Sequence, residues 1–137
     1  MKPVNPTTDL SRIIEGWAAQ FPSKTALHFQ GSDISYSRLW QSIEEKTATL
    51  DVCKGDRVAW LGYNNPEMLV LLFALARLGA ILVPLNWRLT AAEHKAILAD
   101  CAPKWIFSAS PRDFLRTTTS QERLPHSRPQ STRRRPF

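Results

Sequence analysis

A chain of 137 residues with 43% hydrophobic content has room for one globular domain, which would bury roughly two thirds of its unfolded surface. The net charge of +6 is uneven, because residues 1–109 carry eleven Lys and Arg against ten acids, whereas residues 110–137 carry seven Arg against two acids. The basic character belongs to the end of the chain, which argues against a folded domain that binds nucleic acid.

The cysteines and histidines give no pattern of a metal site or of a disulfide framework. Cys53 and Cys101 form no CxxC pair, and His28, His94 and His126 share no ligand spacing with them. Residues 1–9 contain no apolar signal core, so we expect reduced thiols and a cytoplasmic protein.

The first predicted elements are a helix, a hairpin and a second helix. Apolar residues recur at helical spacing over residues 10–21, and Pro22 ends the pattern. Residues 25–30 alternate as a strand, Gly31-Ser32 predicts a turn, and residues 33–35 can return beside the first strand. A capping serine and an apolar stripe then predict a helix over residues 36–50.

The central stretch, residues 54–86, has the pattern of a βαβ unit. An apolar strand at residues 57–62 leads through Asn64-Asn65-Pro66 into an apolar helix of about thirteen residues, which Gly79 ends. A second strand follows at residues 81–85 and must be parallel to the first. The apolar run is too short for a bilayer, which needs ~20 residues, so we expect a buried crossover helix and no membrane span.

A second crossover helix and a third strand follow the central stretch. Thr90 and Glu93 form a capping box, which predicts a helix over residues 91–101. Pro103 ends this helix, and residues 105–109 form another apolar strand. The fold class is therefore α/β: a partial, parallel Rossmann-like sheet of three strands with crossover helices, preceded by the helix and the hairpin.

Neither helix start in this sheet has the sequence of a phosphate site. The turn at residues 62–67 has no GxGxxG and no GxxxxGK[ST], Pro66 removes a donor, and Glu67 places a carboxylate where phosphate charge would lie. The second helix start is occupied by its own capping box. No serine lies in a GxSxG elbow, so nucleophilic catalysis has no local signature either.

The composition changes after residue 109. Residues 110–137 contain no Val, Ile, Ala, Gly, Met or Trp. Such a segment cannot bury enough surface to offset ~1–2 kcal/mol per residue of backbone ordering, so we expect a disordered basic tail. Seven arginines without a lysine also suggest the hypothesis of a shifted reading frame.

Together, the residues before the tail resemble the amino-terminal part of the AMP-forming acyl-CoA synthetases, the adenylate-forming or AMP-dependent synthetase and ligase family. The matching motifs, in the family's order, are at residues 34–39, 54–59, 64–67, 76–86, 89–90 and 93. The resemblance covers roughly residues 9–109 and implies that residues 1–109 are the first piece of the large domain of such an enzyme.

The resemblance implies a ligase that activates a small carboxylic acid with ATP and Mg²⁺ and then usually transfers the acyl group to coenzyme A. Family members use a phosphate loop with a lysine, an adenine-binding segment, a ribose-binding aspartate and a lysine on a carboxy-terminal lid. None of these matches a stretch of this sequence; residues 117–120 lack the glycines and lysine of the loop. We therefore assign no catalytic, cofactor-binding or metal-binding residue, and we expect the chain alone to bind no cofactor and to be inactive.

Two alternatives to an inactive fragment remain at this point. The chain could be a regulatory or interaction module that associates with a full-length synthetase. Alternatively, its arginine-rich tail could bind nucleic acid or an acidic surface, which would give weak and steeply salt-dependent binding. The acyl substrate is not specified by the residues present.

Overall fold

The computed structural model describes residues 9–109 and 120–123. The mixed α/β class predicted from the sequence is confirmed, with the predicted helices, hairpin and parallel strands in the predicted order. The elements are α1 (Ser11–Gln20), β1 (Thr25–Phe29), β2 (Ser32–Ser35), α2 (Tyr36–Thr49), β3 (Arg57–Gly62), α3 (Pro66–Leu78), β4 (Ile81–Leu85), α4 (Ala91–Cys101), β5 (Trp105–Ala109) and β6 (Ser120–Arg123).

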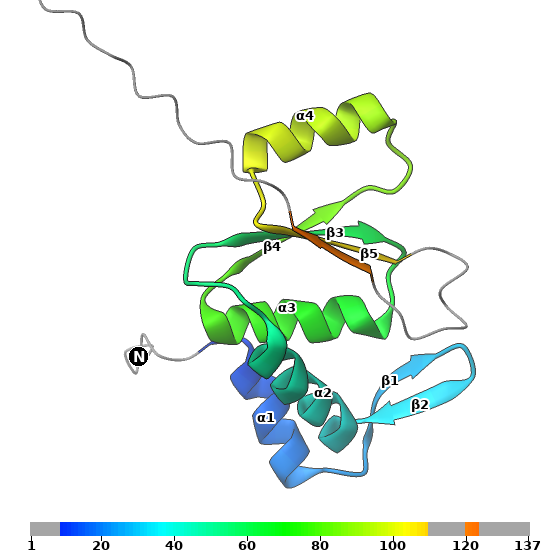
Figure 1. Ribbon diagram of the computed structural model, residues 1–137. Coiled ribbons are helices and arrows are strands. Elements are labelled where there is room, and N and C mark those ends of the chain that lie inside the picture. The colour runs from blue at the N-terminus through cyan, green and yellow to red at the C-terminus, as the bar shows by residue number, and fades with distance from the viewer. Residues whose placement is uncertain (1–8, 110–119, 124–137) are drawn as a thin grey trace, which may run out of the picture.

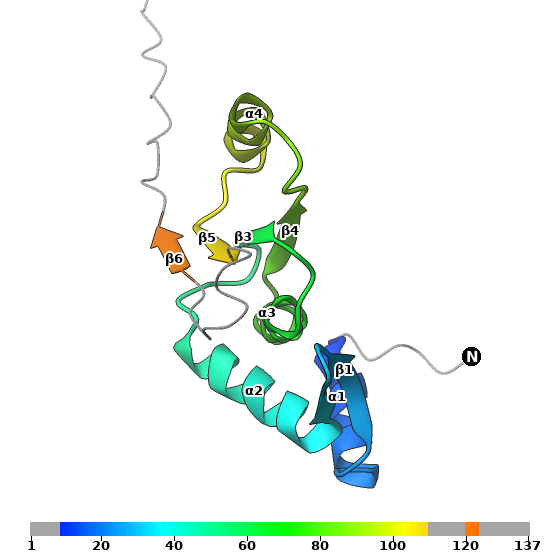
Figure 2. The ribbon, with the colours of Figure 1, turned by 90° about the vertical axis from the view of Figure 1, so that its right-hand side faces the viewer.

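The main sheet separates the helices into layers. Its strand order is β4-β3-β5-β6, in which β3 is parallel to both β4 and β5, and β6 is antiparallel to β5. Helix α3 covers one face of this sheet and α4 lies on the other, while α1 and α2 form a further layer beyond α3 (Figures 1 and 2). The β1–β2 hairpin lies with this outer layer, as a separate two-stranded sheet.

Local capping chemistry sets the bounds of the central helices, as predicted. The side chain of Asn65 accepts a hydrogen bond from the Met68 N–H at the start of α3, and Pro66 occupies the first turn. Gly79 ends this helix in the left-handed conformation, with φ of 68°. A capping box between Thr90 and Glu93 starts α4.

The hairpin turn lies one residue earlier than predicted. Gln30 and Gly31 both have positive φ, at 49° and 78°, so they form the two central positions and Ser32 already belongs to β2. A two-residue hairpin loop favours two positive φ values because this geometry follows the twist of the strands.

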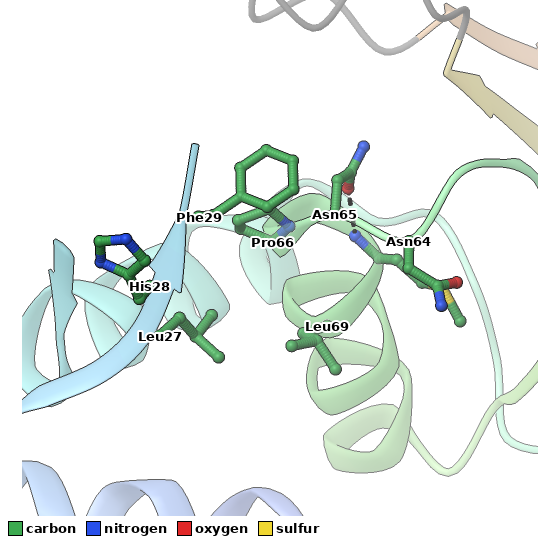
Figure 3. Close-up of a pocket in the computed structure, with 8 residues that line it drawn as sticks. Leu27, His28, Phe29, Asn64, Asn65, Pro66 and Leu69 are labelled. Atoms are coloured by element: carbon green, nitrogen blue, oxygen red, sulfur yellow. Dashed lines mark hydrogen bonds between the residues drawn. The ribbon is translucent and has the colours of Figure 1, made fainter. Parts of the chain in front are cut away.

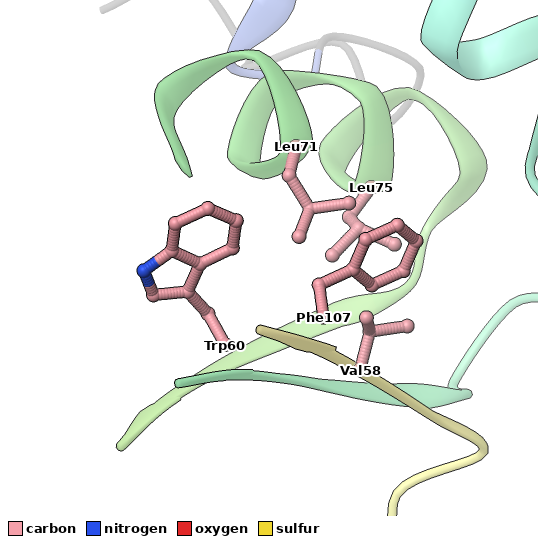
Figure 4. Close-up of a cluster of buried hydrophobic side chains, with 5 residues drawn as sticks. All are labelled: Val58, Trp60, Leu71, Leu75 and Phe107. Atoms are coloured by element: carbon pink, nitrogen blue, oxygen red, sulfur yellow. The ribbon is translucent and has the colours of Figure 1, made fainter. Parts of the chain in front are cut away.

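The main hydrophobic core lies between the sheet and α3 (Figure 4). Val58, Trp60 and Phe107 extend from β3 and β5 towards Leu71 and Leu75 of α3, and each of the five is at most 3% exposed. The prediction of a buried crossover helix is confirmed. Among the described residues, no helix combines the length and the apolar character needed to cross a membrane.

A second cluster joins α3 to the outer layer through Ile14, Leu39, Ile43 and Val70. Only one side of α1 takes part in this packing. Four large apolar side chains of its predicted stripe are 38–58% exposed: Leu10, Ile13, Trp17 and Phe21. Helix α1 therefore presents an apolar stripe to solvent.

Most of the tail predicted to be disordered, residues 110–119 and 124–137, lies outside the described residues. Within it, Ser120–Arg123 form β6, a strand that the sequence did not predict. Its pairing needs only backbone N–H and C=O groups, so it leaves no hydrophobic pattern in the sequence.

Candidate functional site

The carboxyl edge of the parallel strands is the place where this type of sheet binds ligands. From β3 the chain moves to β4 on one side and then crosses to β5 on the other, with α3 and α4 on opposite faces. The order in which the chain adds strands to the sheet therefore reverses between β3 and β5. Ligands of open α/β sheets bind in the crevice at such a point. Here Gly62 lies so close to β5 that a Cβ atom would come within 2.8 Å of the Ala109 carbonyl oxygen, so the position requires glycine.

The start of α3 faces this edge and is held by its own side chains. The Oδ1 atom of Asn65 lies 3.0 Å from the Met68 nitrogen that donates to it. Pro66 has no N–H, and the Glu67 carboxylate in the first turn forms an ion pair of 3.6 Å with Lys46. An incoming phosphate would therefore meet a missing donor, an occupied donor and a negative charge.

The start of α4 is occupied in a similar way. The Glu93 carboxylate accepts hydrogen bonds from the N–H and the hydroxyl of Thr90, both at 2.8 Å, and the Thr90 hydroxyl accepts from the Glu93 N–H at 3.3 Å. The backbone hydrogen bond from Thr90 is the main cause that lowers the pKa of Glu93, followed by the hydroxyl bond. The carboxylate is thus held in its charged form at this helix start.

An aromatic pair follows the ends of β3 and β4. The rings of Tyr63 and Trp87 lie 4.5 Å apart between centroids, and the Arg88 guanidinium lies 5.0 Å from the Trp87 ring. Trp87 is 43% exposed. The two rings are tilted by 49° to each other and follow closely after the strands.

The described histidines and cysteines form no metal site. No group of three His, Cys, Asp or Glu side chains within residues 9–109 is arranged to hold a metal ion. His28 pairs with Asp33 at 2.5 Å on the exposed hairpin, and His94 pairs with the carbonyl oxygen of Asn86 at 2.7 Å. Both cysteines are free thiols, and burial raises the pKa of Cys101, which lowers its thiolate fraction. His126 lies outside the described residues.

The charged groups at the amino edge have structural partners. Asp56 accepts the Cys53 N–H at 2.7 Å and closes the turn before β3. The Lys104 ammonium lies 3.4 Å from Asp56 and 3.6 Å from Asp51, and Arg57 donates to the Cys101 carbonyl at 3.4 Å. These contacts join the turn before β3 to the turn before β5.

A hollow lies between the hairpin and the start of α3 (Figure 3). It has a volume of about 350 Å³, and Leu27 of β1 points across it towards Leu69 of α3. The lining residues are mostly apolar: Leu27, His28, Phe29, Asn64, Asn65, Pro66, Met68 and Leu69. The mostly apolar lining of this groove suits an apolar group, and the His28 in the lining is paired with Asp33. The sequence did not predict it, because it depends on how the hairpin is placed beside α3.

Comparison with known proteins identifies the family. Residues 14–135 match the family described as AMP-binding enzyme. The chain belongs to this family. It is 47% identical over 102 residues to an indoleacetate–CoA ligase of Aromatoleum aromaticum, and the match covers 72% of the chain and 20% of that ligase.

Further relatives agree in both sequence and structure. A feruloyl-CoA synthase of an Amycolatopsis species is 40% identical over 86 residues, which cover 61% of the chain and 18% of the synthase. The N-terminal domain of FACL13 from Mycobacterium tuberculosis, solved with an inhibitor, gives a TM-score of 0.70 at 28% identity, covering 80% of the chain and 30% of that domain. The chain thus spans about a fifth of the length of the curated relatives, and its fold is similar to that of the N-terminal domain of FACL13.

Proposed function

We propose that this chain is the amino-terminal framework of an ATP-dependent acid–thiol ligase, and that it has no catalytic activity by itself. In the complete enzyme, a carboxylic acid and ATP would give an acyl-adenylate, and the acyl group would pass to coenzyme A. The observation that carries the proposal is the match of residues 14–135 to the AMP-binding enzyme family over about a fifth of the relatives' length.

The described residues do not fit ATP or Mg²⁺, which supports the second part of the proposal. Both helix starts at the carboxyl edge have an occupied donor and a glutamate in the first turn. A magnesium site needs carboxylate and other oxygen ligands around one point, and the acidic side chains of residues 9–109 do not converge in that way.

A buried, unsatisfied polar atom also fits a framework that needs further chain. The indole N–H of Trp60 is buried and has no hydrogen-bond acceptor within the described part of the molecule. In Figure 4 its nitrogen points away from the cluster around Leu71 and Phe107. Such a donor costs about 1–3 kcal/mol if it stays unpaired, so the rest of a large domain is a natural source of the acceptor.

In this proposal the chain has a boundary near residue 109, and the protein is cytoplasmic. Residues 1–109 would belong to the ligase domain, and residues 110–137 would form the basic tail. The free thiols of Cys53 and Cys101 fit a reducing compartment. Genomic DNA tests the shifted frame: the hypothesis fails if neither of the other two frames after codon 109 continues an α/β pattern. The family match itself continues past this boundary to residue 135.

Exchange of radiolabel between pyrophosphate and ATP tests the function. We expect the purified chain to give only background exchange with a panel of aryl and fatty acids. The full-length indoleacetate–CoA ligase, assayed with its own acid, is the positive control. Exchange by the chain well above background, dependent on one added acid, would show that it contains a working adenylation site.

A second candidate is an interaction module that associates with a full-length synthetase. The stripe of Leu10, Ile13, Trp17 and Phe21 on α1 favours it, because exposed apolar surface of this kind often marks a protein contact. Co-purification of a synthetase with the chain, lost in an Ile13→Glu variant and kept in an Arg12→Glu variant, would support this function. Equal recovery with both variants would contradict a role for the stripe.

A further inference from the structure

The outer edges of the main sheet differ in their capacity to accept another strand. On one side β4 carries Pro84, which is exposed and lies in register with Trp60 of β3. Proline has no N–H for a ladder and is tolerated in sheets mainly on edge strands. The β4 side is therefore a natural end of the sheet, and growth of the sheet is favoured on the β5 side.

The β5 edge is a strong template for pairing. Successive residues of a strand direct their backbone groups to alternate sides, so part of the N–H and C=O groups of Trp105–Ala109 bond to β3 and the others face outward. The strand sequence WIFSA is apolar and rich in β-forming residues. Left open, such an edge would pair with strands of other molecules.

In this chain β6 occupies that edge. Its four residues pair antiparallel with β5, from Trp105 opposite Arg123 to Ser108 opposite Ser120. The sequence SQER carries no apolar residue, so side-chain burial gives no reason for this strand to form here. Its contribution is the backbone ladder that it supplies to β5.

We propose that β6 caps the β5 edge in cis and blocks this interaction surface to strands of other molecules, including β5 of a second copy. Only residues 110–119 separate the two strands in sequence. A link of this length holds β6 near β5 at an effective concentration on the order of millimolar, which a second molecule at micromolar concentration does not reach. Pairing of β6 with β5 of the same molecule is therefore favoured over pairing between molecules, as long as β6 can donate its backbone hydrogen bonds.

Substitutions that act on the backbone test the proposal in the full chain. Adjacent strand residues face opposite sides, so the double change Gln121→Pro and Glu122→Pro must remove an N–H that faces β5. The matched control, Gln121→Ala and Glu122→Ala, changes the same side chains and keeps both N–H groups. The readouts are hydrogen exchange of residues 105–109 and the molar mass from light scattering at increasing concentration.

We expect the proline variant to exchange its β5 amides at least about tenfold faster at low concentration and to form dimers or larger species on concentration. The alanine variant should stay protected and monomeric. Equal behaviour of the two variants in both measurements would overturn the proposal. It would also be overturned if the amides of α3 lost protection as strongly as those of β5, since β6 would then stabilise the whole fold instead of capping one edge.

Discussion

Replacing Leu71 by alanine tests whether the contact between α3 and the sheet is the centre of stability. Leu71 is 1% exposed and belongs to the same buried cluster as Trp60 and Phe107. Leucine-to-alanine changes at sites of this kind cost about 2–5 kcal/mol, because the apolar contacts are lost and a cavity remains. Single domains have a total stability of only about 5–15 kcal/mol, so the variant should lose a large fraction of its free energy of unfolding.

The same substitution at Leu69 provides a matched control on the same helix. Leu69 is half-buried and lines the groove beside Leu27, so less contact is lost, and we expect a cost of about 1 kcal/mol. Urea unfolding followed by tryptophan fluorescence gives both values, with a shared slope as evidence that the same unit unfolds. An equal or larger loss for Leu69→Ala would refute the assignment of the main core to the sheet and α3.

Two further predictions concern glycines and one helix cap. Gly79→Ala should lower the free energy of unfolding by about 1–2 kcal/mol, because φ is 68° and a Cβ atom would meet Lys54 Cγ at 3.0 Å. Gly16→Ala in α1 should raise it by about 0.5–1 kcal/mol, because the added Cβ would lie in open space. Urea unfolding measures both changes, and a change in the same direction for both variants would contradict the backbone argument. The pKa of Glu93 is lower in the folded chain, so its capping bond is fully present above the ordinary value of about 4.3 and is lost as the pH falls through the lowered value. Helicity measured by circular dichroism should therefore fall in acid more in the parent chain than in Glu93→Gln, and identical profiles would contradict this role.

Local chemistry explains why so much of the fold follows from the sequence. The Asn65-Pro66 start, the Gly79 end and the Thr90–Glu93 box each satisfy backbone groups within a few residues. Such signals do not depend on the remainder of the protein. The bounds of α3 and α4 could therefore be predicted even though the chain covers about a fifth of its relatives.

Features that depend on distant partners could not be predicted in the same way. Helical spacing identified the apolar positions of α1, but it could not show that Ile13 would be 58% exposed while Ile14 packs inward. The groove beside Leu69 depends on the placement of the hairpin. Strand β6 pairs through its backbone, which leaves no pattern in side chains. The same reason restricts what the sequence predicts about the candidate site. The βα units locate the carboxyl edge of the sheet, but the side chains gathered at that edge come from several segments of the chain.

Titration of the purified chain with Mg²⁺ and ATP in a calorimeter tests the central claim most directly, because it examines the helix starts without requiring a substrate acid. The occupied donors at Asn65 and Thr90 and the carboxylates of Glu67 and Glu93 predict no saturable heat up to millimolar nucleotide, beside a clear isotherm for the full-length indoleacetate–CoA ligase. Saturable binding of ATP by the chain at micromolar concentration would contradict the account of a framework without a nucleotide site.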